Sequence, residues 1–174
     1  AAIRRALECG VTYFDTAAGY GDGVSEEIFR DGLGDRTDIF LATKCIATDA
    51  SGVRRSLEKS LGHLGRDSVD LLQVHGSVYE QNEIDRVLAP GGMLDEMEVM
   101  RLEGLVGHIG FTGEAQDQRF FRLLDSGRFE TMQVCYNLMF QHPYDPHWRS
   151  GSMFQAEEAG MGIVTMRSLT AGLF

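Results

Sequence analysis

The sequence predicts an α/β fold built around a parallel β-sheet, and three observations support this prediction. Short apolar runs recur along the 174 residues, and their starts lie 25 to 37 residues apart, about the length of one βαβ unit. Helical patterns fill the gaps between them, and this alternation is typical of parallel sheets. The third run is almost continuously apolar, as expected for a strand buried on both faces. An open doubly wound sheet and a barrel both fit this pattern.

The expected elements alternate along the chain, starting with a helix. Each expected strand is an apolar run of five to seven residues. In chain order these runs are Val11–Asp15, Ile39–Lys44, Val69–His75, Val106–Phe111, Thr131–Cys135 and Met161–Met166. Each expected helix carries apolar residues at about helical spacing, which places them on one face. In chain order these residues are Ile3 and Leu7; Val24, Ile28 and Leu33; Val53, Leu57, Leu61 and Leu64; Met93, Met97 and Met100; Phe120, Phe121 and Leu124; and Met153, Phe154 and Ala156.

Two segments between these elements carry further signals. Asp49 or Ser51 can cap the start of the third helix, and Gly65 can end it. The segment Ser77–Gly92 is longer than its neighbours and has two interpretations. In the first interpretation this segment covers the functional site, and in the second it forms a surface helix over residues 84–88.

Composition indicates one soluble domain that covers residues 1–174. Hydrophobic residues make up 43% and charged residues 24%, which is ordinary for a globular protein. The 16 basic and 26 acidic residues give a net charge of −10, which argues against nucleic-acid binding. No apolar run approaches the roughly 20 residues of a membrane helix, so no membrane contact is expected.

The cysteines argue for a reducing compartment. Cys9, Cys45 and Cys135 are odd in number and widely spaced, and no CxxC pair occurs. This pattern is unlike a disulfide framework or a zinc site, so we expect no metal. With no signal-peptide pattern at the start, the expected location is the cytoplasm.

Ionisable residues close the first three expected strands. These residues are Asp15, Lys44 and His75, and Tyr20 follows Asp15 by five residues. In both candidate architectures the carboxyl ends of the strands carry the functional site. Asp15, His75 and Tyr20 each have a structural explanation when taken alone: a helix cap, a core histidine and a packed tyrosine. A buried lysine, however, needs an anion, which Asp15 on the adjacent strand can supply.

The loop after the first strand is rich in glycine. Gly19, Gly21 and Gly23 give the pattern G-x-G-x-G, whereas a dinucleotide fingerprint is G-x-G-x-x-G. Val24 stands where the third glycine of that fingerprint is expected. We therefore interpret these glycines as turn residues.

Three stretches together resemble the aldo-keto reductase family. The stretch GVTYFDTAAGYGDGVSEEIFRDGL is similar to the family's first signature. FLATK resembles the strand with the family's lysine, and RRSLEKSLGHLGRDSVDLLQVHG resembles its long helix and the strand with its histidine. The later stretches LVGHIGFTGE, FETMQVCYN and GIVTMRSLTAG are weaker matches, and together the resemblance covers essentially the whole chain.

This resemblance implies a reductase of aldehydes or ketones that uses a nicotinamide cofactor, usually NADPH, with NADH as the other possibility. It assigns Asp15, Tyr20, Lys44 and His75 as the catalytic tetrad. Tyr20 would donate the proton to the carbonyl oxygen, and Lys44 would lower its pKa from near 10. Asp15 would hold Lys44, and His75 would polarise or align the carbonyl. The partner implied is a small carbonyl substrate.

The same resemblance implies five cofactor-binding residues. Thr112 stands in place of the serine of the family's Ser-Asn pair, and Gln133 matches its glutamine on the next strand. Met166 stands where many members stack a tyrosine on the nicotinamide. Arg167 is expected either to approach a phosphate of the cofactor or to be solvated, and Leu169 is the fifth expected cofactor contact.

The family's fold is an eight-stranded (β/α)8 barrel, and this sequence supplies about six βα units. We therefore expect a fragment that lacks the first strand and the C-terminal cofactor-binding segment. Two other functions remain open: a non-catalytic, cofactor-sensing or regulatory subunit of the same fold, and an open-sheet dehydrogenase. The sequence predicts no oligomeric state.

Overall fold

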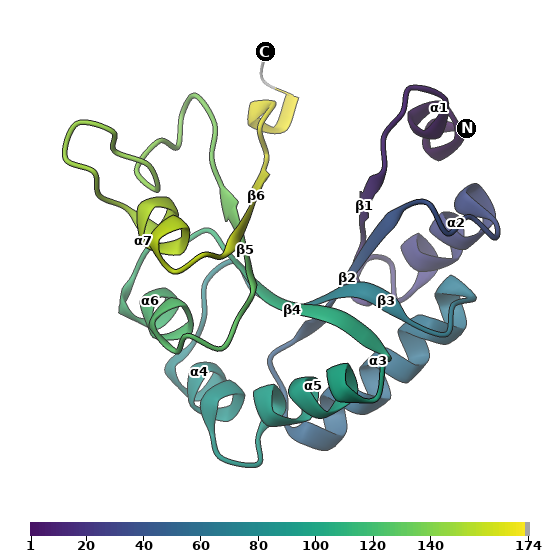
Figure 1. Ribbon diagram of the computed structural model, residues 1–174, viewed down its shortest axis with the longest axis horizontal. Helices are drawn as coiled ribbons and strands as arrows, with labels where there is room; N and C mark the ends of the chain where they lie inside the picture. The colour runs from purple at the N-terminus through teal and green to yellow at the C-terminus, as the bar shows by residue number, and fades with distance from the viewer. Residues whose placement is uncertain (173–174) are drawn as a thin grey trace.

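All six expected strands form, and the computed structural model, which describes residues 1–172, joins them in one parallel sheet. The strands lie side by side in sequence order, and the sheet curls so that its two ends face each other across an open side (Figure 1). This order excludes the doubly wound alternative, whose strand order reverses at a switch point. The strands are β1 (Tyr13–Asp15), β2 (Phe40–Ile46), β3 (Val69–His75), β4 (Val106–Gly113), β5 (Thr131–Cys135) and β6 (Gly162–Met166).

The helices lie on the convex outer side of the curled sheet (Figure 1). One helix precedes β1, a pair of helices connects β3 to β4, and a single helix makes each other connection. This is the alternation of a (β/α)8 barrel, of which the sheet forms about six units. The helices are α1 (Ala2–Glu8), α2 (Val24–Leu33), α3 (Ala50–Leu64), α4 (Gln81–Leu88), α5 (Met93–Leu102), α6 (Gln118–Asp125), α7 (Ser152–Glu158) and the short 3₁₀ helix η1 (Thr170–Gly172).

The strand register places several polar residues on the concave inner face. Lys44 pairs with Gln73 on β3, and Thr112 pairs with Gln133 on β5. Asp15 pairs with Ala42, two residues before Lys44 and therefore on the same face of β2. The parallel pairing thus brings an acid, a base and two amides to one rim of the sheet.

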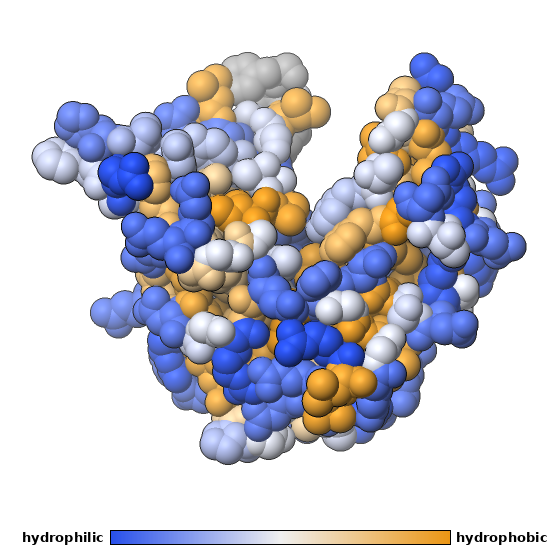
Figure 2. Space-filling model, in the orientation of Figure 1, coloured by the Kyte–Doolittle hydropathy of each residue, from blue (hydrophilic) through white to orange (hydrophobic). Residues whose placement is uncertain are grey.

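The main hydrophobic core lies between the convex face of the sheet and the helices. The stripe of Met93, Met97 and Met100 on α5 is completely buried there, which confirms its interpretation as a core face. Figure 2 shows the hollow between the two ends of the sheet, with hydrophobic surface on both of its sides. Burying each large apolar side chain contributes about 1.5–3 kcal/mol to folding. The largest fully buried side chains include Leu57, Leu72, Ile84, Ile109, Phe111 and Phe120.

One expectation about the helix faces was wrong. Val24 and Ile28 on α2 are exposed, and the buried face of this helix carries Glu26, Leu33 and the half-buried Phe29. A carboxylate takes a core position because it has partners there, as described below. On α6, Phe120 and Leu124 are buried and the partly buried Phe121 packs against the core, as expected, and Leu123 is fully buried as well.

The segment Ser77–Gly92 does not lie over the hollow. It contains α4, whose Ile84 and Val87 are fully buried and whose contacts are with α5 and α6. Only its beginning reaches the carboxyl rim of the sheet, where Ser77 lies and where the Tyr79 hydroxyl donates to the Thr112 backbone oxygen over 2.6 Å. The helix interpretation of this segment is therefore confirmed.

Helix α3 begins and ends as its sequence predicts. The Asp49 side chain accepts a hydrogen bond from the Gly52 amide over 2.7 Å, so Asp49 rather than Ser51 caps the helix. Gly65 ends it in the left-handed region, with φ at 62°. Within residues 1–172 no helix is both long enough and apolar enough to cross a bilayer.

Candidate active site

A buried ion pair occupies the centre of the inner face. Lys44 Nζ donates to Asp15 Oδ2 over 2.5 Å and to the backbone oxygen of Thr16 over 2.8 Å. The Lys44 side chain is only 2% exposed and that of Asp15 is 22% exposed. The structure thus pairs the strand-end lysine with the anion that the sequence analysis expected for it.

Two amides complete the hydrogen bonding of Asp15. Gln73 Nε2 donates to Asp15 Oδ1 and Gln133 Nε2 donates to Oδ2, each over 3.2 Å. The carboxylate therefore receives bonds from β2, β3 and β5, which hold it in one orientation. Gln73 was missed by the sequence analysis, although a glutamine inside an otherwise apolar strand is a signal of a buried polar contact.

Tyr20 and His75 lie beside this pair. The two rings are perpendicular, with centroids 5.4 Å apart, and Lys44 Nζ lies 5.2 Å from the centroid of the Tyr20 ring. Tyr20 is 44% exposed, so its ring faces the open side of the site. The turn that carries it uses Gly21 and Gly23 at positive φ, which confirms the interpretation of these glycines as turn residues.

The other three residues of the expected tetrad have shifted pKa values. Burial lowers the pKa of Lys44, while Asp15 opposes this change. Burial and the nearby Lys44 charge lower the pKa of His75, so the imidazole is neutral at pH 7. Burial and the Asp15 charge raise the pKa of Tyr20, while Arg167 opposes them.

The direction of the Tyr20 shift corrects an expectation. Lys44 was expected to lower the pKa of this phenol, whereas the pKa is raised. The main physical reason is that burial disfavours the charged phenolate, and the Asp15 carboxylate, which is bonded to the ammonium, adds to this effect. In this structure Tyr20 is therefore a protonated donor at neutral pH.

A cleft of about 360 Å³ opens at this rim of the sheet. All four residues of the expected tetrad line it, together with Thr112, Gln133, Met166 and Arg167 from the expected cofactor set and with Gly76, Ser77 and Glu114. Leu169 is the exception, because it is 81% exposed and does not line the cleft. The geometry therefore brings together eight of the nine residues that the resemblance singled out.

The polar groups of the cofactor set differ in how they are bonded. The Thr112 hydroxyl donates to the Gly76 oxygen over 2.8 Å and accepts from the Gly76 amide over 3.0 Å, so the backbone engages it in both roles. Gln133 Oε1 is buried at the cleft and has no hydrogen-bond partner within residues 1–172. Of the two, the glutamine oxygen is the acceptor that remains available.

Arg167 is held at the mouth of the cleft. Its guanidinium lies 2.7 Å from Glu114 Oε1, which also accepts from the Ser77 hydroxyl over 2.8 Å. Asn137 Nδ2 donates to the Arg167 backbone oxygen over 3.0 Å, and φ of Arg167 is 57°. Glu114 was not expected at the site, because nothing in its local sequence pattern marks it, whereas Ser77 begins the segment that had a position over the site as one of its two interpretations.

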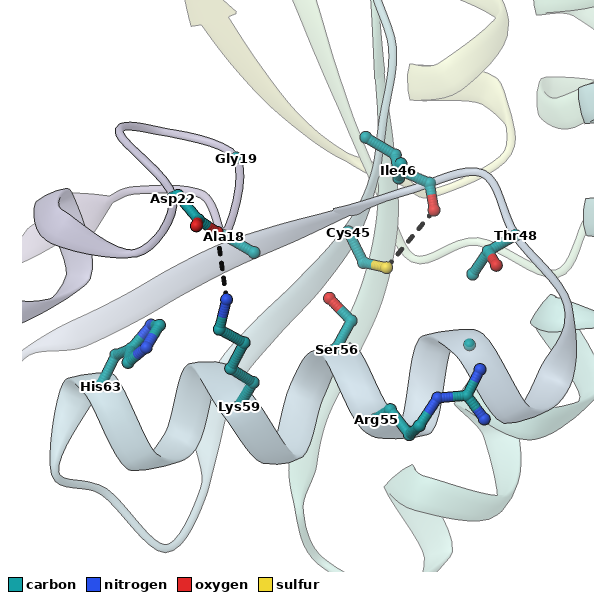
Figure 3. Close-up of a pocket in the computed structure, with 11 residues that line it drawn as sticks. Ala18, Gly19, Asp22, Cys45, Ile46, Thr48, Arg55, Ser56, Lys59 and His63 are labelled. Carbon is teal, nitrogen blue, oxygen red and sulfur yellow. Dashed lines mark hydrogen bonds and ion pairs between the residues drawn. The ribbon is translucent and has the colours of Figure 1, made fainter.

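A second cleft, of about 420 Å³, lies between the Tyr20 loop and α3 (Figure 3). Helix α3 presents Arg55, Lys59 and His63 toward it at intervals of one turn, and Lys59 Nζ pairs with Asp22 in the loop over 3.0 Å. Burial raises the pKa of the Cys45 thiol in its wall, which makes this cysteine a poor nucleophile. No group of three or more metal-binding side chains gathers within the part of the chain that the structure describes.

Comparison with known proteins agrees with this architecture. Solved structures of similar fold include an aldo-keto reductase from Bacillus halodurans in its holo form, at 23% identity and a TM-score of 0.80, with 98% of this chain and 57% of that chain covered. Another is an aldo/keto reductase from Klebsiella pneumoniae in complex with NADP and acetate, at 22% identity and a TM-score of 0.74, with 98% and 58% covered. At these identities the likeness shows the fold alone.

Sequence relatives include L-galactose dehydrogenase from Arabidopsis thaliana, 32% identical over 65% of this chain and 37% of that protein. Methylglyoxal reductase from Escherichia coli is 30% identical over 79% of this chain and 48% of that protein. The chain thus spans half or less of the length of these curated relatives. The family model described as "Aldo/keto reductase family" matches residues 1–174. On this match over its whole length, the chain belongs to the aldo/keto reductase family.

Proposed function

We propose that this protein reduces an aldehyde or ketone to an alcohol with a nicotinamide cofactor. The observation that carries the proposal is the convergence of Tyr20, His75 and the Lys44–Asp15 pair on one cleft at the carboxyl rim of the sheet. A phenol, a neutral imidazole and a buried ammonium are the groups that a carbonyl oxygen needs as it gains negative charge. Family membership supports the same chemistry.

The residues present fit the nicotinamide end of such a cofactor. Gln133 offers a buried oxygen that lacks a partner within residues 1–172, and this oxygen can accept a bond from a carboxamide N–H. The Met166 thioether lines the same cleft and can cover a flat ring. Arg167 can approach a phosphate if it leaves Glu114. When bound, the reduced nicotinamide supplies a hydride to the carbonyl carbon.

We favour NADPH over NADH as the cofactor. The support comes from two Klebsiella pneumoniae neighbours, one described as a complex with NADP and acetate and one as a complex with NADPH. Thr112 is proposed as a second contact, although its hydroxyl is engaged by Gly76 in this structure. Leu169 stays a weaker proposal because it lies outside the cleft.

Tyr20 is the proposed proton donor. A phenol with its ordinary pKa near 10 is already protonated at neutral pH, so the acid is present before the reaction, and the raised pKa of Tyr20 makes it a weaker acid until a bound substrate gains charge. The phenolate that forms after transfer lies close to the Lys44 ammonium, which stabilises it more than the neutral phenol. His75, neutral because its pKa is lowered, can donate a hydrogen bond to the substrate oxygen without competing as an acid.

The proposed substrate is a small carbonyl compound. We propose the cytoplasm as its location, on the grounds of three unpaired thiols, Cys9, Cys45 and Cys135.

The substitution Tyr20→Phe tests the proposal. It removes the proton donor and keeps the ring, so we expect carbonyl-dependent oxidation of NADPH to fall by about 10²- to 10⁴-fold. Binding of NADPH, followed by its fluorescence, is expected to stay within twofold. Tyr144→Phe is the matched control, because Tyr144 stacks on Phe154 away from the cleft.

Two results would contradict the proposal. If Tyr20→Phe reduces carbonyls as fast as the parent, Tyr20 is not the acid. If the parent binds NADPH but turns over no member of a panel of aldehydes and ketones, the protein is a cofactor-binding subunit without catalytic activity.

A further inference from the structure

A buried carboxylate on α2 takes no part in the chemistry proposed above. Glu26 is the third residue of that helix and is 0% exposed. Its Oε1 accepts from the Thr43 hydroxyl on β2 over 2.7 Å, and its Oε2 lies 3.1 Å from His63 Nδ1 on α3. One side chain therefore joins three elements that are far apart in the sequence.

The two ends of this connection lead directly to the active site. Thr43 precedes Lys44 on β2, so a bond to Thr43 holds the strand that carries the ammonium. On the other side, the amide of Ser25 donates to the Tyr20 backbone oxygen over 3.2 Å, and Glu26 is the next residue. Glu26 thus links the first turn of α2, to which the Tyr20 loop is bonded, to the strand of Lys44.

Gly23 shows that the chain makes room for this connection. A Cβ at this position would lie 2.1 Å from His63 Cε1, a distance at which one of the groups must move. The His63 ring rises from α3 toward the loop at this point (Figure 3). The third glycine of the loop, at φ 94°, therefore serves two purposes: it closes the turn and it admits the imidazole that bonds Glu26.

Burying a carboxylate is costly unless its hydrogen bonds are satisfied. Glu26 recovers part of this cost from its two partners and from the amino end of α2, where the helix dipole favours negative charge. An apolar residue of similar size would fill the space without any such cost. What an apolar residue would not supply is a directional bond to β2.

We propose that Glu26 is a positioning residue, which sets the Tyr20 phenol against Lys44 and His75 through its bonds to Thr43 and His63. Only the expected change in kcat depends on the proposed reduction. The placement of Tyr20 is a property of the protein itself and can be measured without turnover.

The first test measures the pKa of Tyr20 by NMR in protein with ring-labelled tyrosine, with the signal assigned from Tyr20→Phe. In the parent this pKa is raised by burial and by Asp15. Glu26→Leu fills the space but removes both bonds, so the loop moves away from β2 and we expect the pKa of Tyr20 to fall toward its ordinary value of 10.0. Glu26→Gln keeps an acceptor for Thr43, and its NH2 group can donate to His63 Nδ1 in the tautomer that carries the ring proton on Nε2, so we expect the parent pKa of Tyr20.

The second test is kinetic. A displacement of about 1 Å between catalytic groups costs about 10²-fold in rate, so we expect kcat of Glu26→Leu to fall by about that factor while the affinity for NADPH stays within twofold. Thr43→Val cuts one bond at constant volume and is expected to give a smaller fall of about tenfold, whereas Thr43→Ser keeps the hydroxyl and the parent kcat. Glu27→Gln, on the exposed side of the same helix turn, is the matched control.

The outcomes separate positioning from mere stabilisation. If Glu26→Leu and Thr43→Val lower the melting temperature but leave both the pKa of Tyr20 and kcat unchanged below the melting range, the proposal is overturned. If Glu26→Leu does not fold, the comparison of Thr43→Val with Thr43→Ser decides whether the proposal holds. If the parent reduces no carbonyl, the proposed function fails, and the tyrosine titration still decides the role of Glu26.

Discussion

The Lys44–Asp15 pair allows a quantitative prediction for stability. Lys44→Met keeps the length of the side chain but leaves the Asp15 carboxylate facing two amides without its cation. Removing one member of a buried pair costs about 3–5 kcal/mol, and the 22% exposure of the Asp15 side chain places this case at the lower end, at about 3 kcal/mol. For a chain of this length each kcal/mol corresponds to about 2–4 °C, so we expect a loss of about 6–12 °C in the melting temperature.

A double-mutant cycle measures whether this loss comes from the pair. Urea unfolding, followed by circular dichroism, would give the free energy of unfolding for Lys44→Met, Asp15→Asn and the combination. Because the uncompensated charge is absent from the double variant, we expect it to be at least about 1 kcal/mol more stable than the sum of the single losses predicts. Additive losses, or a loss below about 1 kcal/mol for Lys44→Met, would refute the interpretation of these residues as one buried unit.

Three further predictions concern pH, a glycine and a cap. Burial lowers the pKa of His75 from its ordinary 6.5, so the unfolded chain binds the proton more readily than the folded chain does. The free energy of unfolding should therefore fall as the pH drops below about 6.5. His75→Gln should make this fall smaller, as measured by urea unfolding at a series of pH values. Gly23→Ala should lower the free energy of unfolding by more than about 1 kcal/mol, because φ is 94° and the added Cβ would meet the His63 ring. Gly19→Ala has open space at its Cβ, so it should leave the free energy of unfolding unchanged or raise it slightly. Equal effects of the two substitutions would contradict this account. Asp49→Ala should lower the free energy of unfolding more than Ser51→Ala, because only Asp49 bonds a helix amide of α3; thermal melts compare the two.

Much of the fold follows from local pattern. The six apolar runs predict the six strands because the βαβ repeat leaves a regular spacing of apolar segments. The helix faces are less predictable, as α2 shows. Its apolar residues at 24 and 28 are exposed, and the polar Glu26 is buried, because distant partners on β2 and α3 satisfy it. Local periodicity carries no information about such partners.

The candidate site divides in the same way. Asp15, Lys44 and His75 stand out in the sequence because each closes an apolar strand, where a charged residue needs an explanation. Glu114 does not stand out, since its role depends on a contact with a residue 53 positions away. Gln73 interrupts an apolar strand, but its partner Asp15 lies 58 positions away, so the local pattern does not show what it bonds. Leu169 was expected in the cofactor set by position alone, and the structure leaves it exposed outside the cleft.

The sequence by itself determined the repeating α/β pattern, the strand-end residues and the resemblance that the match to the aldo/keto reductase family bears out. The tertiary structure alone decided how these residues act on one another. Parallel pairing in sequence order curls the sheet and places Asp15 between donors from β2, β3 and β5. The resulting burial and the shared carboxylate raise the pKa of Tyr20, the reverse of the direction expected from residue types alone. A pKa depends on the solvation and the charges around a group, and these exist only once the chain has folded.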